Sequence, residues 1–331
     1  MVQVEIRQTE TLGTVYVLQN ETQAVSLSPF GARLLGWEIN IADTKRDIVV
    51  GFDSLSQHKE HRYFGATIGP VAGRIIDGNF TLEDRVYQLE TTENGHTLHS
   101  GALGLDQVMF EASTNETQGE ASVCFVTTFE DPDNRFPGKI LVKVTYTLTK
   151  ANQLTITYDA TTDTPTLFNP TNHGYFNLTG DAGQAINAHH LQINAHHVAA
   201  KKADVTTTGE RLVVTDTPYD FEQTKRIGEV ALDDPFILDH EEAVDLVLTS
   251  PDEQVVLTVN TDAPAVILYT TGSHEEGQMM KQNQTMANRG SIAIETQGIP
   301  GSERYEQFPS IVLTPETPFH SQTTYELIGK E

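Results

Sequence analysis

The residues from Asn169 to Asn177 carry an unusual concentration of polar groups between two segments that read as β-strand. His173, Tyr175 and Asn177 occupy alternate positions in this stretch. Alternate side chains of an extended segment point to the same face. Such a face could hydrogen-bond a polar ligand, and His173 is its one member that titrates near neutral pH. We therefore predict a polar binding wall with one acid–base group.

A second candidate for proton transfer is Glu295, which ends an apolar strand-like run over residues 291–297. Glutamate is depleted in strands. If Glu295 points inward, burial raises its pKa unless hydrogen-bond donors hold it charged. A raised pKa suits a general base at neutral pH. The alternative is a surface charge at the end of a strand.

Two glycine-containing segments each place a polar side chain where a ligand could approach. Residues 64–75 are uncharged except for Arg74, whose guanidinium could hold sugar hydroxyls or a carboxylate. The alternative for Arg74 is a structural ion pair. In residues 94–101, glycines lie on both sides of His96 and His99, and glycine allows close backbone approach or positive φ. The alternative there is an ordinary turn with surface histidines.

Two histidine pairs, at 189–190 and 196–197, are seven residues apart. Positions i and i+7 of a strand lie on opposite faces, and no cysteine or carboxylate accompanies the pairs, so we expect a polar strand and loop rather than a metal site. The chain also lacks a nucleophile elbow, a P-loop, a dinucleotide-binding glycine motif and a Cys-x-x-Cys pair.

The elements that must position these residues are mostly strands. Period-two segments rich in Val, Ile, Thr, Tyr and Phe recur along the chain, as expected for half-buried strands. Residues 142–149 and 154–158 predict a long hairpin with its turn near Asn152. Helical periodicity is limited to one or two turns at 54–61 and at 224–229. We predict an all-β fold, a large antiparallel β-sandwich with few short helices, forming one domain over residues 1–331.

Composition narrows the partners. The chain has 331 residues, with 21 Lys plus Arg against 46 Asp plus Glu, a formal net charge of −25. Nucleic acid and anionic membranes require basic patches, so neither is an expected partner. The single cysteine, Cys124, excludes an intramolecular disulfide and is expected to be buried in a strand. No signal peptide and no apolar run of ~18 residues is present, which predicts a cytoplasmic protein.

Several of these stretches together resemble the aldose 1-epimerase, or galactose mutarotase, family. The resemblance runs in order from about Gly31 to the C-terminus. It rests on segments similar to the family's Asn-Pro-Thr-x-His-x-Tyr-Phe-Asn-Leu, Leu-His-Gly-Gly, Phe-Gly-Ala-x-x-Gly…Arg-Ile, Asp-His-x-Phe and Glu-Thr-Gln motifs. In this chain they are residues 169–178, 97–101, 64–75, 232–238 and 294–297.

The resemblance implies a large β-sandwich with its site on one concave sheet face. It implies that His173 is the general acid that protonates the ring oxygen and that Glu295 is the general base at the anomeric hydroxyl. It also implies that Arg74, His99 and Asp233 bind the sugar, without a metal, a cofactor or a covalent nucleophile. Asp233 and Asp234 are adjacent, so an alignment slip could exchange their roles.

The chain departs from the family pattern around the binding residues. Pro70 and Gly73 stand where many members carry Arg and Asn, Asp234 replaces a histidine, and Ile267 stands where some members have a substrate-binding glutamine. These departures concern the sugar-binding residues and not the expected acid–base pair, so they bear on which sugar is preferred and not on the reaction.

Three hypotheses follow from the sequence. The leading one is an isomerase that interconverts the anomers of hexoses such as galactose or glucose, acting as a monomer or homodimer. One alternative is an epimerase for a disaccharide such as maltose or for a sugar phosphate, and the phosphate version is disfavoured because Arg74 is the one cationic side chain in these segments. The other alternative is a carbohydrate-binding protein without catalysis, which would need no matched proton donor and acceptor.

Overall fold

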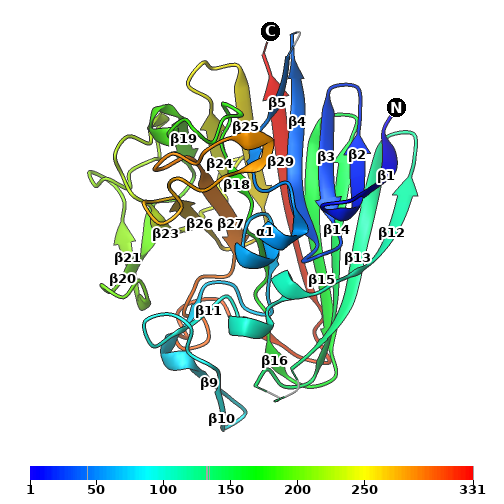
Figure 1. Cartoon of the computed structure of the whole chain (residues 1–331). Coiled ribbons are helices and arrows are strands. Elements are labelled where there is room, and N and C mark those ends of the chain that lie inside the picture. The colour runs from blue at the N-terminus through cyan, green and yellow to red at the C-terminus, as the bar shows by residue number, and fades with distance from the viewer. Residues whose placement is uncertain (43, 132, 134, 331) are drawn as a thin grey trace.

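The chain folds into large antiparallel sheets with loops gathered at one side, as the computed structural model shows (Figure 1). The structure describes residues 1–42, 44–131, 133 and 135–330. The largest sheet has nine strands, in the order β12 (Glu111–Glu116), β13 (Glu120–Glu130), β14 (Lys139–Thr149), β15 (Gln153–Thr162), β29 (Phe319–Gly329), β25 (Val255–Thr261), β24 (Leu246–Thr249), β19 (His190–Ile193) and β22 (Lys225–Arg226).

A seven-stranded sheet carries most of the predicted site. Its order is β21 (Thr207–Val213), β20 (His197–Lys201), β23 (Asp233–Ile237), β26 (Ala265–Thr270), β27 (Ile292–Gln297), β18 (Tyr175–Phe176) and β6 (Val49–Val50). The pairings along β26 and β27 are antiparallel. The predicted all-β fold with large antiparallel sheets is therefore confirmed.

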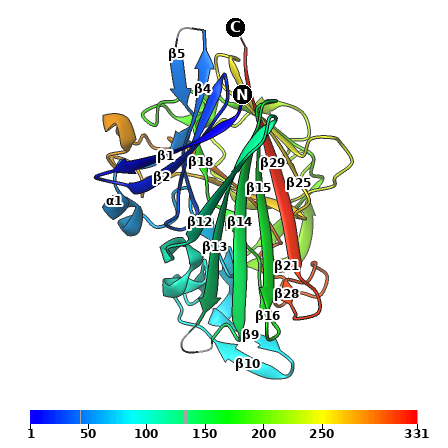
Figure 2. The same ribbon diagram turned by 90° about the vertical axis from the view of Figure 1, so that its right-hand side faces the viewer.

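The N-terminal residues form a five-stranded sheet, and short strand pairs complete the fold. The five strands are β1 (Gln3–Thr9), β2 (Gly13–Gln19), β3 (Gln23–Ser28), β4 (Arg33–Ile41) and β5 (Thr44–Asp47). The pairs are β7 (Thr67–Ile68) with β17 (Thr171–Asn172), β8 (Arg74–Ile75) with β11 (Thr97–Leu98), β9 (Asn79–Leu82) with β10 (Arg85–Gln88), and β16 (Thr166–Leu167) with β28 (Val312–Leu313). Figure 2 shows the long strands β12 to β15 and β29 side by side.

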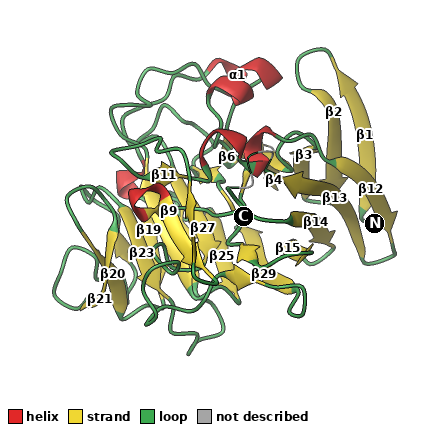
Figure 3. Cartoon of the chain, turned by 90° about the horizontal axis from the view of Figure 1, so that it is seen from below, coloured by secondary structure: helices red, strands yellow, loops and turns green. Residues whose placement is uncertain are grey.

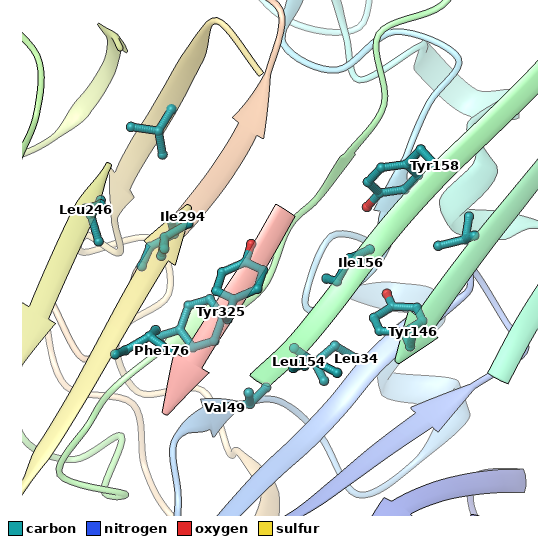
Figure 4. Packing of buried hydrophobic residues seen from close by; sticks show 14 of the residues in the cluster. Leu34, Val49, Tyr146, Leu154, Ile156, Tyr158, Phe176, Leu246, Ile294 and Tyr325 are labelled. Carbon is teal, nitrogen blue, oxygen red and sulfur yellow. The ribbon is translucent and has the colours of Figure 1, made fainter. Parts of the chain in front are cut away.

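The core lies between the nine-stranded sheet on one side and the seven-stranded and five-stranded sheets on the other. Phe176 of β18 faces Tyr325 of β29 with their ring centroids 6.1 Å apart, and Ile294 of β27 joins the same cluster (Figure 4). Ile292 and Ile294 point into this core, so the alternation of a strand sends Ala293, Glu295 and Gln297 to the opposite face. One apolar cluster draws on these sheets, and the single domain stays a prediction.

Local predictions had mixed outcomes. The hairpin of β14 and β15 is confirmed, and Asn152 adopts φ of 65° in its turn, a conformation that asparagine tolerates well. Helix α1 (Leu55–Glu60) is capped by Ser54, whose hydroxyl accepts from the Gln57 N–H. Figure 3 shows how little helix the fold contains. The described residues include no helix long and apolar enough to cross a membrane.

Two local predictions were wrong. The expected helical turn at 224–229 contains strand β22, because Lys225 and Arg226 pair with the edge of β19 instead. Cys124 is half-buried rather than buried. It lies in β13 between Val123 and Phe125, which are both fully buried, so alternation puts the thiol on the face of the sheet away from the core.

Candidate active site

A cavity of about 440 Å³ lies over the outer face of the seven-stranded sheet. This volume is within the ~300–1,000 Å³ that is typical of small-molecule sites. All five predicted site residues line it: Arg74, His99, His173, Asp233 and Glu295. They come from five separate segments of the chain, and the fold brings them to one place.

His173 and Glu295 lie side by side in the cavity. Nε2 of His173 lies 3.4 Å from Oε1 of Glu295, and the side chains of both residues are 5% exposed. His173 follows β17, and its backbone is pinned by hydrogen bonds to Gly65 and Ala66. Glu295 lies in β27 directly opposite Ile267 of β26. The pair is therefore held by backbone pairing on both sides.

Burial shifts the pKa of each member of the pair toward its uncharged form. Desolvation lowers the pKa of His173 to about 3, with a smaller contribution from the charge of Arg33. Desolvation, together with the nearby Asp233, raises the pKa of Glu295 to about 8, against the opposing charge of Arg74. Between these values the pair holds one proton and no net charge, so a proton can be given and a proton taken at adjacent atoms of one ligand.

Arg74 and Asp233 form an ion pair at the cavity wall. Nη2 of Arg74 lies 3.5 Å from Oδ2 of Asp233, and Nε of Arg74 also binds Glu93. Asp233 lines the cavity, whereas Asp234 is buried and pairs with Lys201 at 2.7 Å. The strand alternation of β23 sends the two neighbouring side chains to opposite faces. This placement supports Asp233 as the ligand-facing aspartate.

His99 is a neutral hydrogen-bond donor in this site. Its Nδ1 accepts the Gly73 N–H at 3.1 Å, so the neutral ring carries its proton on Nε2. Burial, with the neighbouring His173 and Arg74, lowers the pKa of His99 well below its usual value. His99 packs edge-on against His173 with centroids 5.3 Å apart.

By distance alone, His99, His173 and Glu295 could hold a metal ion, since one ligand atom from each lies within 4.8 Å of the others. The hydrogen bonding opposes this use. A metal needs an unprotonated ring nitrogen, but Nδ1 of His99 already accepts the Gly73 N–H and Nε2 is then protonated. The three residues fit hydroxyl binding and proton transfer better than metal ligation, and the expectation of a metal-free, cofactor-free site stays a prediction.

Aromatic rings hold His173 in position. Tyr175 stacks on His173 with ring centroids 4.8 Å apart. Tyr63 stacks on His173 with centroids 5.8 Å apart and meets His99 edge-on at 4.7 Å. Tyr175 also lines the cavity. Asn177 does not follow the predicted alternation. Its amide donates to three backbone carbonyls of surrounding loops, including that of Gly290, so it braces the loops and does not line the cavity.

Several cavity residues were not predicted from the sequence. Tyr269 lies beside Ile267 on the same face of β26, and its hydroxyl donates to the buried Glu275 at 2.7 Å. Alternation within residues 265–270 was the signal that could have found it. Arg74 is also not the one cation near the site, because Arg62 and Lys201 line the cavity too. Arg62 and Lys201 come from segments in which the sequence showed no functional motif.

Comparisons with known proteins agree with the fold and with the family resemblance. The family model described as Aldose 1-epimerase matches residues 14–326. The chain is 30% identical to an aldose 1-epimerase of Escherichia coli, with 94% of each chain covered, and 28% identical to a maltose epimerase of Levilactobacillus brevis, with 95% of each covered. The solved structure of an aldose epimerase homologue from C. elegans superposes with a TM-score of 0.87 at 25% identity, with both chains fully covered.

Proposed function

Because the chain belongs to the aldose 1-epimerase family of isomerases, we propose that it interconverts the α and β anomers of a hexose such as galactose or glucose. The observation that carries this proposal is the contact of His173 with Glu295 inside the cavity. Opening a sugar ring needs a proton taken from O1 and a proton given to O5, and both oxygens are bonded to the same carbon. An acid and a base in contact can serve both oxygens at once.

In the reactive form of the pair, its one proton lies on His173, so Glu295 is a carboxylate. Glu295 then removes the proton of the anomeric hydroxyl while the protonated His173 donates a proton to the ring oxygen. The C1–O5 bond breaks, an aldehyde forms at C1, and rotation about C1–C2 exposes its other face. Ring closure reverses both proton transfers and gives the other anomer. General acid and general base groups each contribute typically ~10²–10⁴-fold in rate. Arg74, His99 and Asp233 would bind the sugar hydroxyls.

The charges of the cavity favour a neutral sugar over a sugar phosphate. Three Lys or Arg side chains line the cavity, and each already pairs with a carboxylate: Arg62 with Asp106, Arg74 with Glu93 and Asp233, and Lys201 with Asp234. Glu60, Glu275 and Glu295 add further carboxyl groups to the wall. Among the described residues that line the cavity, a phosphate dianion would therefore meet no Lys or Arg that is free of a carboxylate partner.

A disaccharide is the second candidate substrate. The cavity continues along β27 beyond Glu295 to Gln297 and Pro300, and then to Thr207 of β21. Such an extension could hold a second sugar ring whose reducing end meets the acid–base pair. The L. brevis relative is named a maltose epimerase, which makes maltose the natural disaccharide to test.

The test is polarimetry of freshly dissolved α-galactose, α-glucose and an anomerically pure maltose, each corrected for spontaneous mutarotation in the same buffer. We expect the protein to accelerate equilibration of at least one of them, and the ratio of kcat/KM values to identify the preferred sugar. If calorimetry shows that these sugars bind while none equilibrates faster than in buffer, the protein is a carbohydrate-binding protein and the proposal is wrong.

The pH dependence of kcat/KM should reflect the titration of His173 and Glu295 as a coupled pair and not the pKa of either residue alone. Activity needs one proton on the pair, and the pKa values of about 3 for His173 and about 8 for Glu295 bound that state. We expect kcat/KM to be flat between these values and to fall above pH 8, where the pair loses its proton and no acid remains. The value of kcat/KM should also fall near pH 3, where the pair binds a second proton and no base remains. An acid limb at the ordinary histidine pKa of ~6.5 would contradict this account.

A further inference from the structure

Gln297 is a buried glutamine without a hydrogen-bond partner in the described part of the chain. It is 2% exposed, and neither its Oε1 nor its Nε2 is bonded. It belongs to β27, two residues beyond Glu295, so both side chains lie on the same face of the strand. Gln297 also lines the cavity.

An unsatisfied buried amide is costly, because each group left unpaired has lost its hydrogen bonds to water without gaining others. Gln23 shows what a structural glutamine does in this fold. It is 3% exposed, its Nε2 donates to the Leu327 carbonyl at 2.6 Å, and its Oε1 accepts from the Trp37 indole at 2.9 Å. The next residue, Gly298, does not need the side-chain amide of Gln297 either. Its backbone N–H donates to the Asn169 side chain, and its carbonyl accepts from the same side chain.

The surroundings of Gln297 place its amide beside the groups expected to bind the sugar. A Cβ atom at Gly73 would lie 3.4 Å from Nε2 of Gln297, so the glycine brings the two segments close together. The same Gly73 donates its N–H to His99 and precedes Arg74. Across the sheet, Gln297 faces the small Ala265, which offers its amide no side-chain hydrogen bond.

We propose that Gln297 is a substrate-binding residue whose amide donates one hydrogen bond to a sugar hydroxyl and accepts another, on the side of Glu295 away from Tyr175. This inference rests on the proposed function. A hydroxyl both donates and accepts, as an amide does. An anion offers acceptors alone, and the paired cations of the cavity disfavour it, so a neutral polyol is the matching ligand.

The experiment compares Gln297→Leu with Gln23→Leu, because leucine is similar in size to glutamine and both sites are equally buried. For Q297L we expect KM, and the Kd measured by calorimetry, to rise about tenfold for the sugar that is turned over, with kcat within about twofold of wild type. Its Tm should equal or exceed that of wild type, since the substitution removes an unpaired buried group. For Q23L we expect the reverse, a lower Tm and an unchanged KM.

Galactose and maltose form the two arms of the experiment. A rise in KM and Kd for both sugars assigns the contact to the reacting ring, and a rise for maltose alone assigns it to the second ring. Either result supports the proposal. Unchanged Kd values for both sugars, or a fall in Tm as large as that of Q23L, would overturn it. Because Kd is measured without turnover, a protein that binds sugars but does not epimerise them would refute the proposed reaction and still test Gln297.

Discussion

Replacing Glu295 by glutamine is expected to lower kcat by ~10²–10⁴-fold while the fold is retained. The amide has nearly the shape of the carboxyl group but cannot accept the proton of the anomeric hydroxyl. Burial already disfavours the charge of Glu295, as its raised pKa of about 8 shows, so the neutral amide fits the site. Polarimetry with the preferred sugar measures kcat, and circular dichroism checks the fold.

Asp245→Asn is the matched control, since Asp245 is 1% exposed, accepts hydrogen bonds from the Thr261 N–H and from His240, and does not line the cavity. It should keep kcat and lose stability. An E295Q variant with wild-type kcat would falsify the assignment of the base.

The same substitution should change how stability depends on pH. The folded-state pKa of Glu295 lies near 8, above its usual value of 4.5, so the native state favours the protonated form. Its contribution to stability is present below pH 4.5 and is lost as the pH rises through 8. The E295Q variant has no such loss, so its Tm relative to wild type should increase between pH 5 and pH 9. A constant difference in Tm over that range would contradict the raised pKa.

The strands could be predicted from the sequence because alternation reports local burial. The hairpin of Lys139–Thr149 and Gln153–Thr162 follows from its period-two pattern and from Asn152 at the turn. The segment at 224–229 could not be predicted, because the pairing of Lys225 and Arg226 with β19 is a tertiary contact. Short polar segments carry too little pattern to compete with such contacts.

The residues of the site could be predicted singly, but their contacts could not. His173 and Glu295 stood out as polar groups beside apolar runs, and the family resemblance related them. Their 3.4 Å contact depends on how β17 and β27 are placed by the sheets, which no local pattern contains. The choice between Asp233 and Asp234 also needed the arrangement of the sheets. Alternation predicts that the two side chains lie on opposite faces of the strand, but it does not say which face lines the cavity.

Replacing His173 by glutamine is expected to lower kcat by a similar ~10²–10⁴-fold, because the ring oxygen then has no proton donor. His189→Gln is the matched control. His189 is fully buried, its Nε2 accepts the Leu178 N–H at 3.1 Å, and it does not line the cavity, so kcat should be kept. An H173Q variant that keeps kcat while H189Q loses it would remove His173 from the reaction.

The double variant H173Q/E295Q separates a true proton-sharing pair from two independent groups. If the two residues act as a unit on one proton, the second substitution should add little to the loss caused by the first. Losses that multiply would show that acid and base act independently.

Stability gives a second signature with opposite signs for the two residues. The folded-state pKa of His173, about 3, lies below its usual value of 6.5, so its contribution is present above pH 6.5 and is lost as the pH falls toward 3. H173Q should therefore gain Tm relative to wild type as the pH falls, whereas E295Q should gain as the pH rises. Opposite slopes in these two series are what one proton shared by a buried neutral pair requires.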